Sequence, residues 1–189
     1  MAFTQGLVEV DSLRLTQLYL SKKKMDAIEA WFSPSLKNFG PIPVHSFDGG
    51  QNLYITDGHT RTYVAWKRGL TRIPCVYDDS DIVTCALGQI QYKIDVEWCE
   101  RFGLTHIKKL ENRILSGTDY ALLWQGRCEK MYDMVCALEE QRLSEQLLRT
   151  KETALRDKGL YVYGISSDLK TLCCEDRTGK LYEIPLNGR

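Results

Sequence analysis

The chain has 189 residues, of which 43% are hydrophobic, so it can bury the core of one domain of average size, with or without an appendage. Its 25 basic residues balance its 25 acidic residues, which argues against a non-specific nucleic-acid coat, since such proteins usually carry a basic excess. The sequence shows no membrane span or secretory signal peptide, and its seven cysteines are scattered without a C-x-x-C pair, so we expect a cytoplasmic protein without a zinc motif.

A short strand and a helix are predicted at the start of the chain. Residues 8–13 alternate apolar and polar side chains, which is the signal of a strand that ends in a turn. Ser21 is a suitable N-cap for a helix whose apolar residues recur at helical spacing. These residues are Met25, Ile28, Trp31 and Phe32. Lys22–Lys24 fall in the first turn, where positive charge opposes the helix dipole, so we expect a solvated helix end; a ligand-facing basic patch is the alternative.

A hairpin and a second helix are predicted next. Residues 43–47 and 53–55 resemble two strands, joined by a turn at Asp48-Gly49-Gly50, because Asp and Gly tolerate positive φ. The helix that follows is expected to begin near Thr60 and to end at Gly69, a good C-cap.

A third strand is predicted over residues 73–77, and Asp78-Asp79-Ser80-Asp81 closes this part of the chain. The acidic run suits a helix cap or a solvated loop, and a metal site is the less common alternative. Because residues 53–55 and 73–77 flank the second helix, we expect these two strands to lie in one mixed sheet.

The rest of the chain is predicted to be helical first and to form strands at its end. Residues 81–158 are mostly helical in pattern, with turn signals at Gly103 and at Ser116-Gly117. One long charged helix is expected to carry Leu138, Leu147, Leu148 and Leu155. Residues 160–186 predict a small antiparallel meander. The predicted fold class is therefore α+β, in three parts that span 7–80, 81–158 and 159–189.

The sequence TDGHTR, residues 56–61, lies where a strand leads into a helix. The first N–H groups of a helix have no intrahelical acceptor and carry the positive end of the helix dipole, so such a corner favours anions. Gly58 permits close approach of a ligand, while Thr60 and Arg61 supply a hydroxyl donor and a planar fork for phosphate oxygens. His59 can donate to an oxyanion or move a proton near neutral pH.

Asp57 is the member of this turn whose charge does not suit a phosphate site. It could hold Arg61 or His59 in place, coordinate a cation that accompanies the phosphates, or accept a proton. Asp57 and His59 are therefore the candidate catalytic residues. In the plainer alternative Asp57 caps the helix and pairs with Arg61, and His59 is solvated.

The TDGHTR turn, followed by a helix and GLTRIPCVY, resembles the ParB/sulfiredoxin superfamily over roughly residues 7–80. The VEVDSL opening and the PIPV strand belong to the same resemblance. The Asp-Gly-His-x-Arg form is similar to the free serine kinases of that superfamily, in which this loop holds the nucleotide phosphates. The resemblance implies a ParB/sulfiredoxin-like fold and a phosphate site made of Gly58, His59, Thr60 and Arg61, with Asp57 beside them.

Three departures from the superfamily restrict the activity that the resemblance implies. Sulfiredoxins carry a catalytic cysteine where His59 stands, so sulfinic acid reduction is not expected. Partition ParB proteins carry an arginine-rich Gly-Glu-Arg-Arg form, whereas Arg61 is the single arginine of this turn. Free serine kinases use a glutamate base at about the position of Gln17, and glutamine cannot accept the substrate proton. In a kinase, that proton would have to go to another carboxylate: Glu9, Asp11 or Asp57.

Two functions remain open from the sequence. The first is a phosphotransferase that acts on a free amino acid or another small hydroxyl substrate with ADP or ATP and Mg²⁺, in which Arg61 stabilises the developing charge. The second is a non-catalytic module that senses a nucleotide or another phosphorylated ligand, or grips a nucleic-acid phosphate. Gln17 favours the second function, and the neutral net charge favours a nucleotide or small molecule over a nucleic acid as the partner.

Overall fold

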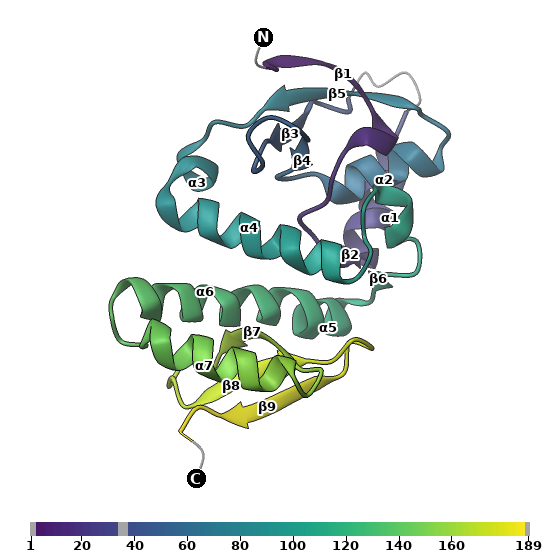
Figure 1. Ribbon diagram of the computed structural model, residues 1–189. Helices are drawn as coiled ribbons and strands as arrows, with labels where there is room; N and C mark the ends of the chain where they lie inside the picture. The colour runs from purple at the N-terminus through teal and green to yellow at the C-terminus, as the bar shows by residue number, and fades with distance from the viewer. Residues whose placement is uncertain (1–2, 34–37, 188–189) are drawn as a thin grey trace. The chain divides into compact units, whose positions relative to one another are not determined.

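The computed structural model describes residues 3–33 and 38–187 (Figure 1). The chain forms two compact units, Met1–Ala121 and Leu122–Arg189, and the division between them falls inside the helical segment 81–158. A mixed four-stranded sheet with helices, a long helical region and a three-stranded antiparallel meander confirm the predicted α+β class. Among the residues described, none of the helices combines the length and the apolar character needed to cross a bilayer.

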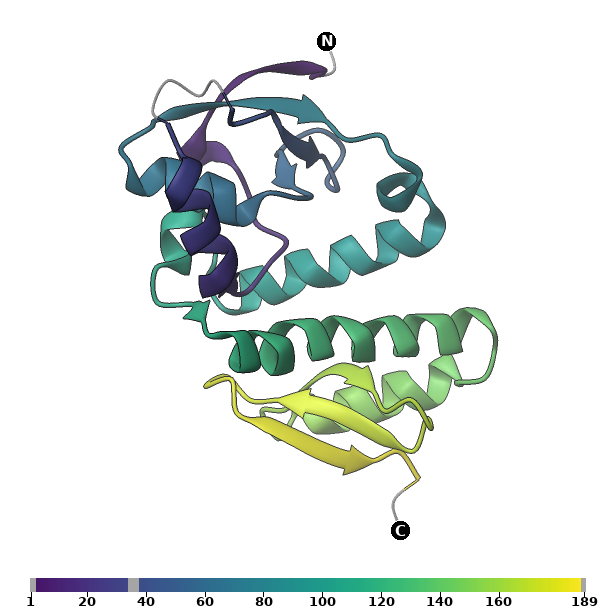
Figure 2. The same ribbon diagram turned by 180° about the vertical axis from the view of Figure 1, so that it is seen from behind.

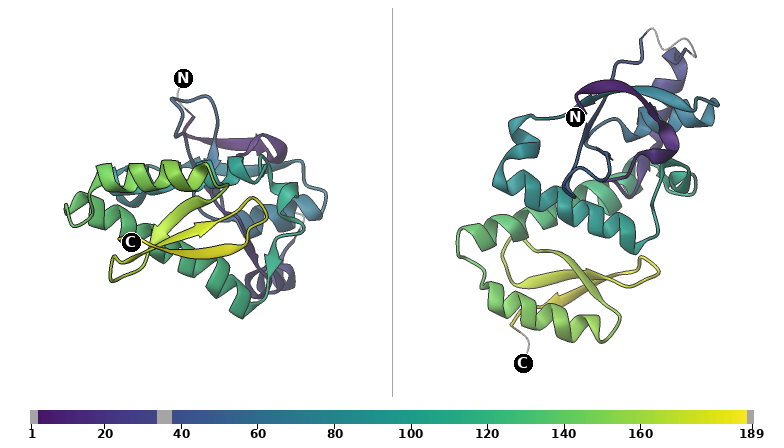
Figure 3. Two further views of the ribbon diagram at one scale, coloured as in Figure 1. Left: turned by 60° about the horizontal axis from the view of Figure 1, so that its bottom comes forward. Right: turned by 45° about the horizontal axis from the view of Figure 1, so that its top comes forward.

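Four strands form the sheet of the N-terminal unit, in the order β1-β5-β3-β4 (Figures 1, 2 and 3). They are β1 (Gln5–Glu9), β3 (Ile42–His45), β4 (Tyr54–Ile55) and β5 (Arg72–Tyr77). β5 pairs antiparallel with β1 and parallel with β3, so the sheet is mixed. β3 and β4 pair antiparallel as a hairpin, and Asp48 in their connection accepts hydrogen bonds from backbone N–H groups. The prediction that residues 53–55 and 73–77 contribute to one sheet is confirmed.

The strand predicted over residues 8–13 lies earlier in the chain than expected, and the turn predicted at its end is present. β1 ends at Glu9, and a 3-10 turn follows over Val10–Ser12. Ser12 Oγ donates to the Glu9 carbonyl at 2.8 Å, which stabilises the turn. Val10 and Leu13 are both buried. They are three residues apart, a spacing that fits a turn and not the two-residue period of a strand.

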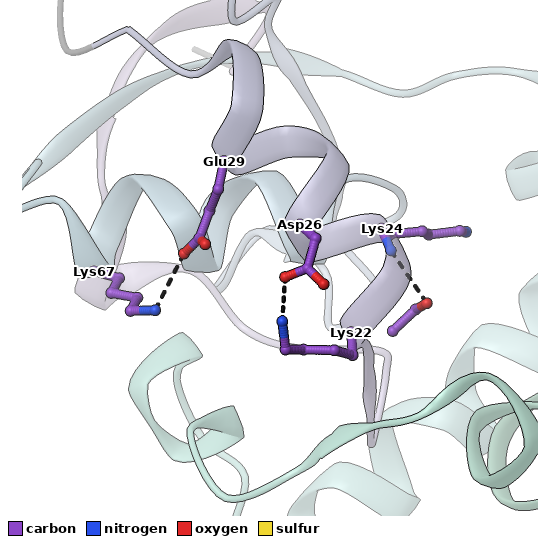
Figure 4. Close-up of polar contacts among 6 residues, drawn as sticks. Lys22, Lys24, Asp26, Glu29 and Lys67 are labelled. Atoms are coloured by element: carbon purple, nitrogen blue, oxygen red, sulfur yellow. Dashed lines mark hydrogen bonds and ion pairs between the residues drawn. The ribbon is translucent and has the colours of Figure 1, made fainter.

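Two helices of this unit begin where the sequence predicts. α1 (Lys22–Trp31) follows Ser21, whose hydroxyl accepts from the backbone N–H of Lys24 at 3.3 Å. α2 (His59–Lys67) leads from β4 towards β5, and Gly69 follows its end with φ +83°. α1 packs on α2, where Lys67 Nζ lies 3.1 Å from Glu29 Oε1 (Figure 4).

Additional elements complete the N-terminal unit. The helical ones are α3 (Asp81–Thr84), α4 (Ala86–Arg101), the 3-10 turn Ile107–Leu110 and α5 (Gly117–Tyr120). Tyr92 of α4 stacks on Phe47 of the hairpin, with ring centroids 5.1 Å apart. β2 (Leu20–Ser21) pairs in parallel with β6 (Ile114–Leu115), and this short ladder was not predicted. It holds the start of α1 beside the segment that leads into α5.

The C-terminal unit packs two helices against the meander (Figure 3). A π-helical turn, Ala121–Gln125, leads into α6 (Gly126–Glu139), and α7 (Glu145–Arg156) follows. The strands β7 (Tyr161–Ile165), β8 (Thr171–Glu175) and β9 (Leu181–Pro185) pair antiparallel in chain order, which confirms the predicted meander. Both helices and the strands contribute to one apolar core, which includes Met134, Ala137, Leu148, Leu155, Ile165, Leu172 and Cys174.

The prediction of one long helix that carries Leu138 together with Leu147, Leu148 and Leu155 is wrong. α6 ends at Glu139, and α7 begins after Ser144, whose hydroxyl accepts from the backbone N–H of Leu147 at 3.3 Å. Gln141 between the helices has φ +57°, a conformation that usually signals glycine or asparagine. The sequence contains neither glycine nor proline between the two helices, so its charged, helical pattern indicates one uninterrupted helix.

A buried ion pair joins α6 to β8 within the C-terminal unit. Arg127 Nη1 donates to Glu175 Oε2 at 2.7 Å, and Arg127 Nη2 also bonds to Glu175 Oε1. Both side chains are buried, and the Arg127 guanidinium lies over the ring of Tyr163 at 4.5 Å from its centroid. Two parallel hydrogen bonds between a guanidinium and a carboxylate form a strong ion pair. If one partner is removed, the other remains as an uncompensated buried charge.

Candidate functional site

Gly58 sets the shape of the turn between β4 and α2. Its backbone is left-handed, with φ +88°, and it is the residue immediately before the first helical residue, His59. A Cβ atom at position 58 would lie 2.9 Å from Ile42 Cδ1 and 3.0 Å from Arg61 Nη2. The turn therefore favours glycine at this position chiefly for its backbone conformation, and a larger residue would also have to displace the ends of the Ile42 and Arg61 side chains.

Side chains from outside the turn hold its first residue, Thr56. Thr56 Oγ1 donates to Asp78 Oδ2 at 2.5 Å, and Tyr92 Oη donates to the Thr56 carbonyl at 3.3 Å. The other Asp78 oxygen accepts from the hydroxyl and the N–H of Ser80, so Asp78 anchors the turn. Within residues 3–33 and 38–187, no cluster of three or more His, Cys, Asp or Glu side chains could hold a metal ion, including at Asp78–Asp81.

The guanidinium of Arg61 is held in place by a backbone carbonyl. Its Nη1 donates to the Phe39 carbonyl at 2.9 Å, and its Nη2 lies 3.7 Å from Asp57 Oδ2. The Asp57 side chain is 83% exposed, so this contact is screened by solvent and contributes little stability. Gly58, not Asp57, occupies the N-cap position of α2, and no side-chain cap is found among the described residues. The first N–H groups of α2 are therefore available to an anion.

His59 is buried, which contradicts the alternative in which it is solvated. Its Nε2 accepts a hydrogen bond from the backbone N–H of Thr16 at 3.1 Å, and Thr16 Oγ1 in turn donates to the Ile55 carbonyl at 2.7 Å. Burial lowers the pKa of His59 to about 4, although the nearby Asp57 carboxylate acts in the opposite direction. The imidazole is therefore neutral at pH 7 and ties the loop around Thr16 to the turn.

The free energy of unfolding should fall as the pH drops below about 6.5. In the unfolded chain His59 takes up a proton near its ordinary pKa of 6.5, whereas in the folded protein it stays neutral until about pH 4. Between these values the unfolded state binds more protons, so acid favours unfolding. Urea denaturation at pH 7 and at pH 4.5 measures the fall. His59→Gln keeps an acceptor but cannot titrate, and it should make the fall smaller; an equal fall in both proteins would contradict a neutral, buried His59.

A cavity of about 290 Å³ lies beside the turn. Its lining comes from three segments: the loop before β2, one face of α1, and the turn itself. The lining residues are Gln17, Lys24, Ala27, Ile28, Asp57, Gly58, His59, Thr60 and Arg61. The structure thus brings together every residue of the sequence-predicted phosphate site, together with Gln17. Two alternative bases, Glu9 and Asp11, instead line a separate cavity with Trp66.

The three lysines at the start of α1 do not share one environment. Lys22 pairs with Asp26 one helical turn later, at an exposed position, as expected for a solvated helix end. The Lys24 side chain extends away from that pair (Figure 4). Lys24 is one of the residues that line the cavity. Lys24, Ala27 and Ile28 lie at i, i+3 and i+4 on one face of α1. That spacing is visible in the sequence, but nothing local indicates that this face meets the turn.

Gln17 is held by two hydrogen bonds of its amide nitrogen. Nε2 donates to the Tyr19 carbonyl at 2.5 Å and to Tyr120 Oη of α5 at 3.3 Å. A carbonyl oxygen can only accept, so the nitrogen of the Gln17 amide must be the atom that faces Tyr19. The orientation of the side chain in the cavity wall is therefore determined by its neighbours.

Comparison of the chain with protein-family models, curated proteins and solved structures finds no match.

Proposed function

We propose that the N-terminal unit binds the phosphate group of a nucleotide or of another phosphorylated small molecule. The observation that best supports this function is the single cavity at which Arg61, Lys24 and the amino end of α2 meet. The amino end of α2, which no described side chain caps, and two cationic side chains complement phosphate in both charge and hydrogen bonding. The Asp57 carboxylate is largely in solvent, so its charge is screened and does not cancel theirs.

The size of the cavity favours a small ligand. Binding sites for small molecules span roughly 300–1,000 Å³, and the cavity volume of about 290 Å³ lies just below that range. It suits a small phosphorylated metabolite or the phosphate end of a nucleotide. A nucleic-acid strand would call for an extended basic surface, which the balance of 25 basic and 25 acidic residues does not favour.

The ParB/sulfiredoxin resemblance is part of this proposal. It is supported by the path of the chain, in which β4 enters the Asp57–Arg61 turn, α2 follows, and β5 returns to the sheet beside β3. It is also supported by Gln17, which lines the cavity at about the position where free serine kinases carry their base. The proposed superfamily domain spans residues 7–80.

A nucleotide-sensing role without catalysis agrees best with the side chains at the cavity. Gln17 cannot accept a proton, and His59 is neutral with its Nε2 already bonded to the backbone. Asp57 is the carboxylate of the cavity lining, and it is the group that could accept a proton from a hydroxyl substrate. Phosphotransfer based on Asp57 is therefore the second candidate function.

Magnesium fits this site as an ion carried by the nucleotide. Mg²⁺ is usually held by one or two carboxylates together with substrate phosphates. Asp57 supplies one carboxylate at the cavity and is exposed enough to turn towards a bound ion. When bound, the ion would reduce the negative charge of the phosphates.

Isothermal titration calorimetry with ADP, ATP, CTP and GTP in the presence of Mg²⁺ tests the proposed function. Lys24→Ala should weaken binding of the best ligand roughly three- to tenfold, because one partly solvated charged contact is lost. Lys23→Ala is the matched control, since Lys23 is an exposed lysine of the same helical turn that does not line the cavity. Equal affinities of the two variants, or no binding of any nucleotide by the wild type, would count against the site.

Phosphoserine formation from serine, with ADP or ATP and Mg²⁺, tests the second candidate. We expect little or no product from the wild type, because Gln17 cannot act as a base. If Asp57 serves as the base, transfer should instead be robust and Asp57→Asn should reduce it about 10²–10⁴-fold. Asp11→Asn is the control, since Asp11 lines a different cavity. Robust transfer that depends on Asp57 and not on Asp11 would replace the sensing role with phosphotransfer.

A further inference from the structure

We infer that Gln17 selects the ligand of this cavity by presenting a neutral hydrogen-bond acceptor, so that the preferred ligand carries a hydroxyl or amino donor beside its phosphate. The inference rests on the proposed function and concerns the part of the ligand that the phosphate contacts leave undefined. It assigns to Gln17 a specificity-determining role in place of an acid–base role.

The hydrogen bonds of the Gln17 amide support this assignment. Both N–H groups have partners within the unit, the Tyr19 carbonyl and the Tyr120 hydroxyl. Gln17 lines the cavity, and within the described residues both hydrogen bonds of its side chain are made by Nε2 and none by Oε1. The polar atom that Gln17 offers to a ligand is therefore a carbonyl oxygen, which accepts a hydrogen bond and does not take the proton away.

The same contacts explain why a carboxylate does not suit this position. A glutamate at position 17 would place an oxygen against the Tyr19 carbonyl, where Gln17 Nε2 now donates at 2.5 Å. Two acceptors cannot form a hydrogen bond with each other, so the contacts around position 17 favour an amide over a carboxylate. A ligand without a donor would leave Oε1 unpaired in the occupied cavity, and sites of this kind reject such ligands.

Three phosphate compounds test the inference by calorimetry in the presence of Mg²⁺: ADP, ribose 5-phosphate and inorganic pyrophosphate. Gln17→Leu keeps the side-chain size but removes the acceptor. It should lower the affinity for ADP roughly three- to tenfold, as expected for one neutral hydrogen bond, and leave the affinity for pyrophosphate unchanged. An equal loss with ribose 5-phosphate would identify a sugar hydroxyl as the donor, whereas a loss confined to ADP would identify the amino group of the base.

Tyr120→Phe provides a second variant that leaves the side chains lining the cavity in place. It removes one of the two partners of the Gln17 amide, so it should reduce ADP affinity by a smaller factor and again spare pyrophosphate. If Gln17→Leu and Tyr120→Phe change ADP and pyrophosphate binding equally, or change neither, the inference is overturned while the phosphate site stands. If pyrophosphate does not bind to the wild type and no nucleotide does, the proposed function fails and the inference fails with it.

Discussion

Replacing Arg127 with alanine should lower the free energy of unfolding by about 3–5 kcal/mol, the cost of leaving a buried charge without its partner. Arg127 and Glu175 are 3% and 1% exposed, and two hydrogen bonds join them inside the C-terminal unit. Removing the guanidinium leaves the Glu175 carboxylate away from water. Urea denaturation followed by circular dichroism measures the loss.

Arg149→Ala is the matched control for this experiment. Arg149 also pairs with a glutamate, Glu145, on a helix of the same unit, but both side chains are mostly in solvent. Its removal should cost about 0–1 kcal/mol. The double replacement Arg127→Met with Glu175→Leu should recover most of the stability, since it leaves no buried charge. A loss for Arg127→Ala as small as that for Arg149→Ala would contradict a buried pair.

Replacing Arg61 with alanine should weaken the proposed nucleotide binding tenfold or more. A charge-assisted hydrogen bond contributes about 1.5–3 kcal/mol, and each 1.4 kcal/mol corresponds to about a factor of ten in affinity. Arg61 is held against the turn by the Phe39 carbonyl, so its fork is positioned before a ligand arrives. Calorimetry with the best nucleotide and Mg²⁺ gives the measurement.

Two further variants separate the charge of Arg61 from its geometry. Arg61→Lys keeps the charge but loses the planar fork, and we expect an affinity between those of the wild type and Arg61→Ala. Arg68→Ala, at the opposite end of α2 and outside the cavity lining, should bind as the wild type does. If Arg61→Ala binds the nucleotide with wild-type affinity, Arg61 does not contribute to the proposed site.

Elements with local signals were predictable from the sequence. Ser21 marks the start of α1 by capping it, Asp48 and two glycines mark the β3–β4 connection, and Gly69 marks the end of α2. The β2–β6 ladder was not predicted, because each strand has two residues and the partners are far apart in the chain. The break between α6 and α7 was also missed, because Gln141 adopts positive φ without a glycine to indicate it.

The candidate site was predictable only where one segment contains it. The Asp57–Arg61 turn is contiguous, so its residue types alone suggest an anion site. Lys24 reaches the cavity through the packing of α1, which no local pattern specifies. The burial of His59 likewise depends on the N–H group of Thr16, a residue on a distant loop, and backbone donors have no signature in the sequence.

Gly58 makes this turn sensitive to point mutation in an unusual way. Every residue other than glycine carries a Cβ, which would lie about 3 Å from the ends of the Ile42 and Arg61 side chains, so those ends would have to shift. The left-handed backbone adds a second penalty that is shared by nearly all replacements. Among replacements at position 58, tolerance should therefore depend little on the size of the new side chain, and Asn and Asp, which adopt positive φ most readily, should be depleted least. In a library of all substitutions at this position, the depletion should appear in a selection for folding as well as in one for ligand binding.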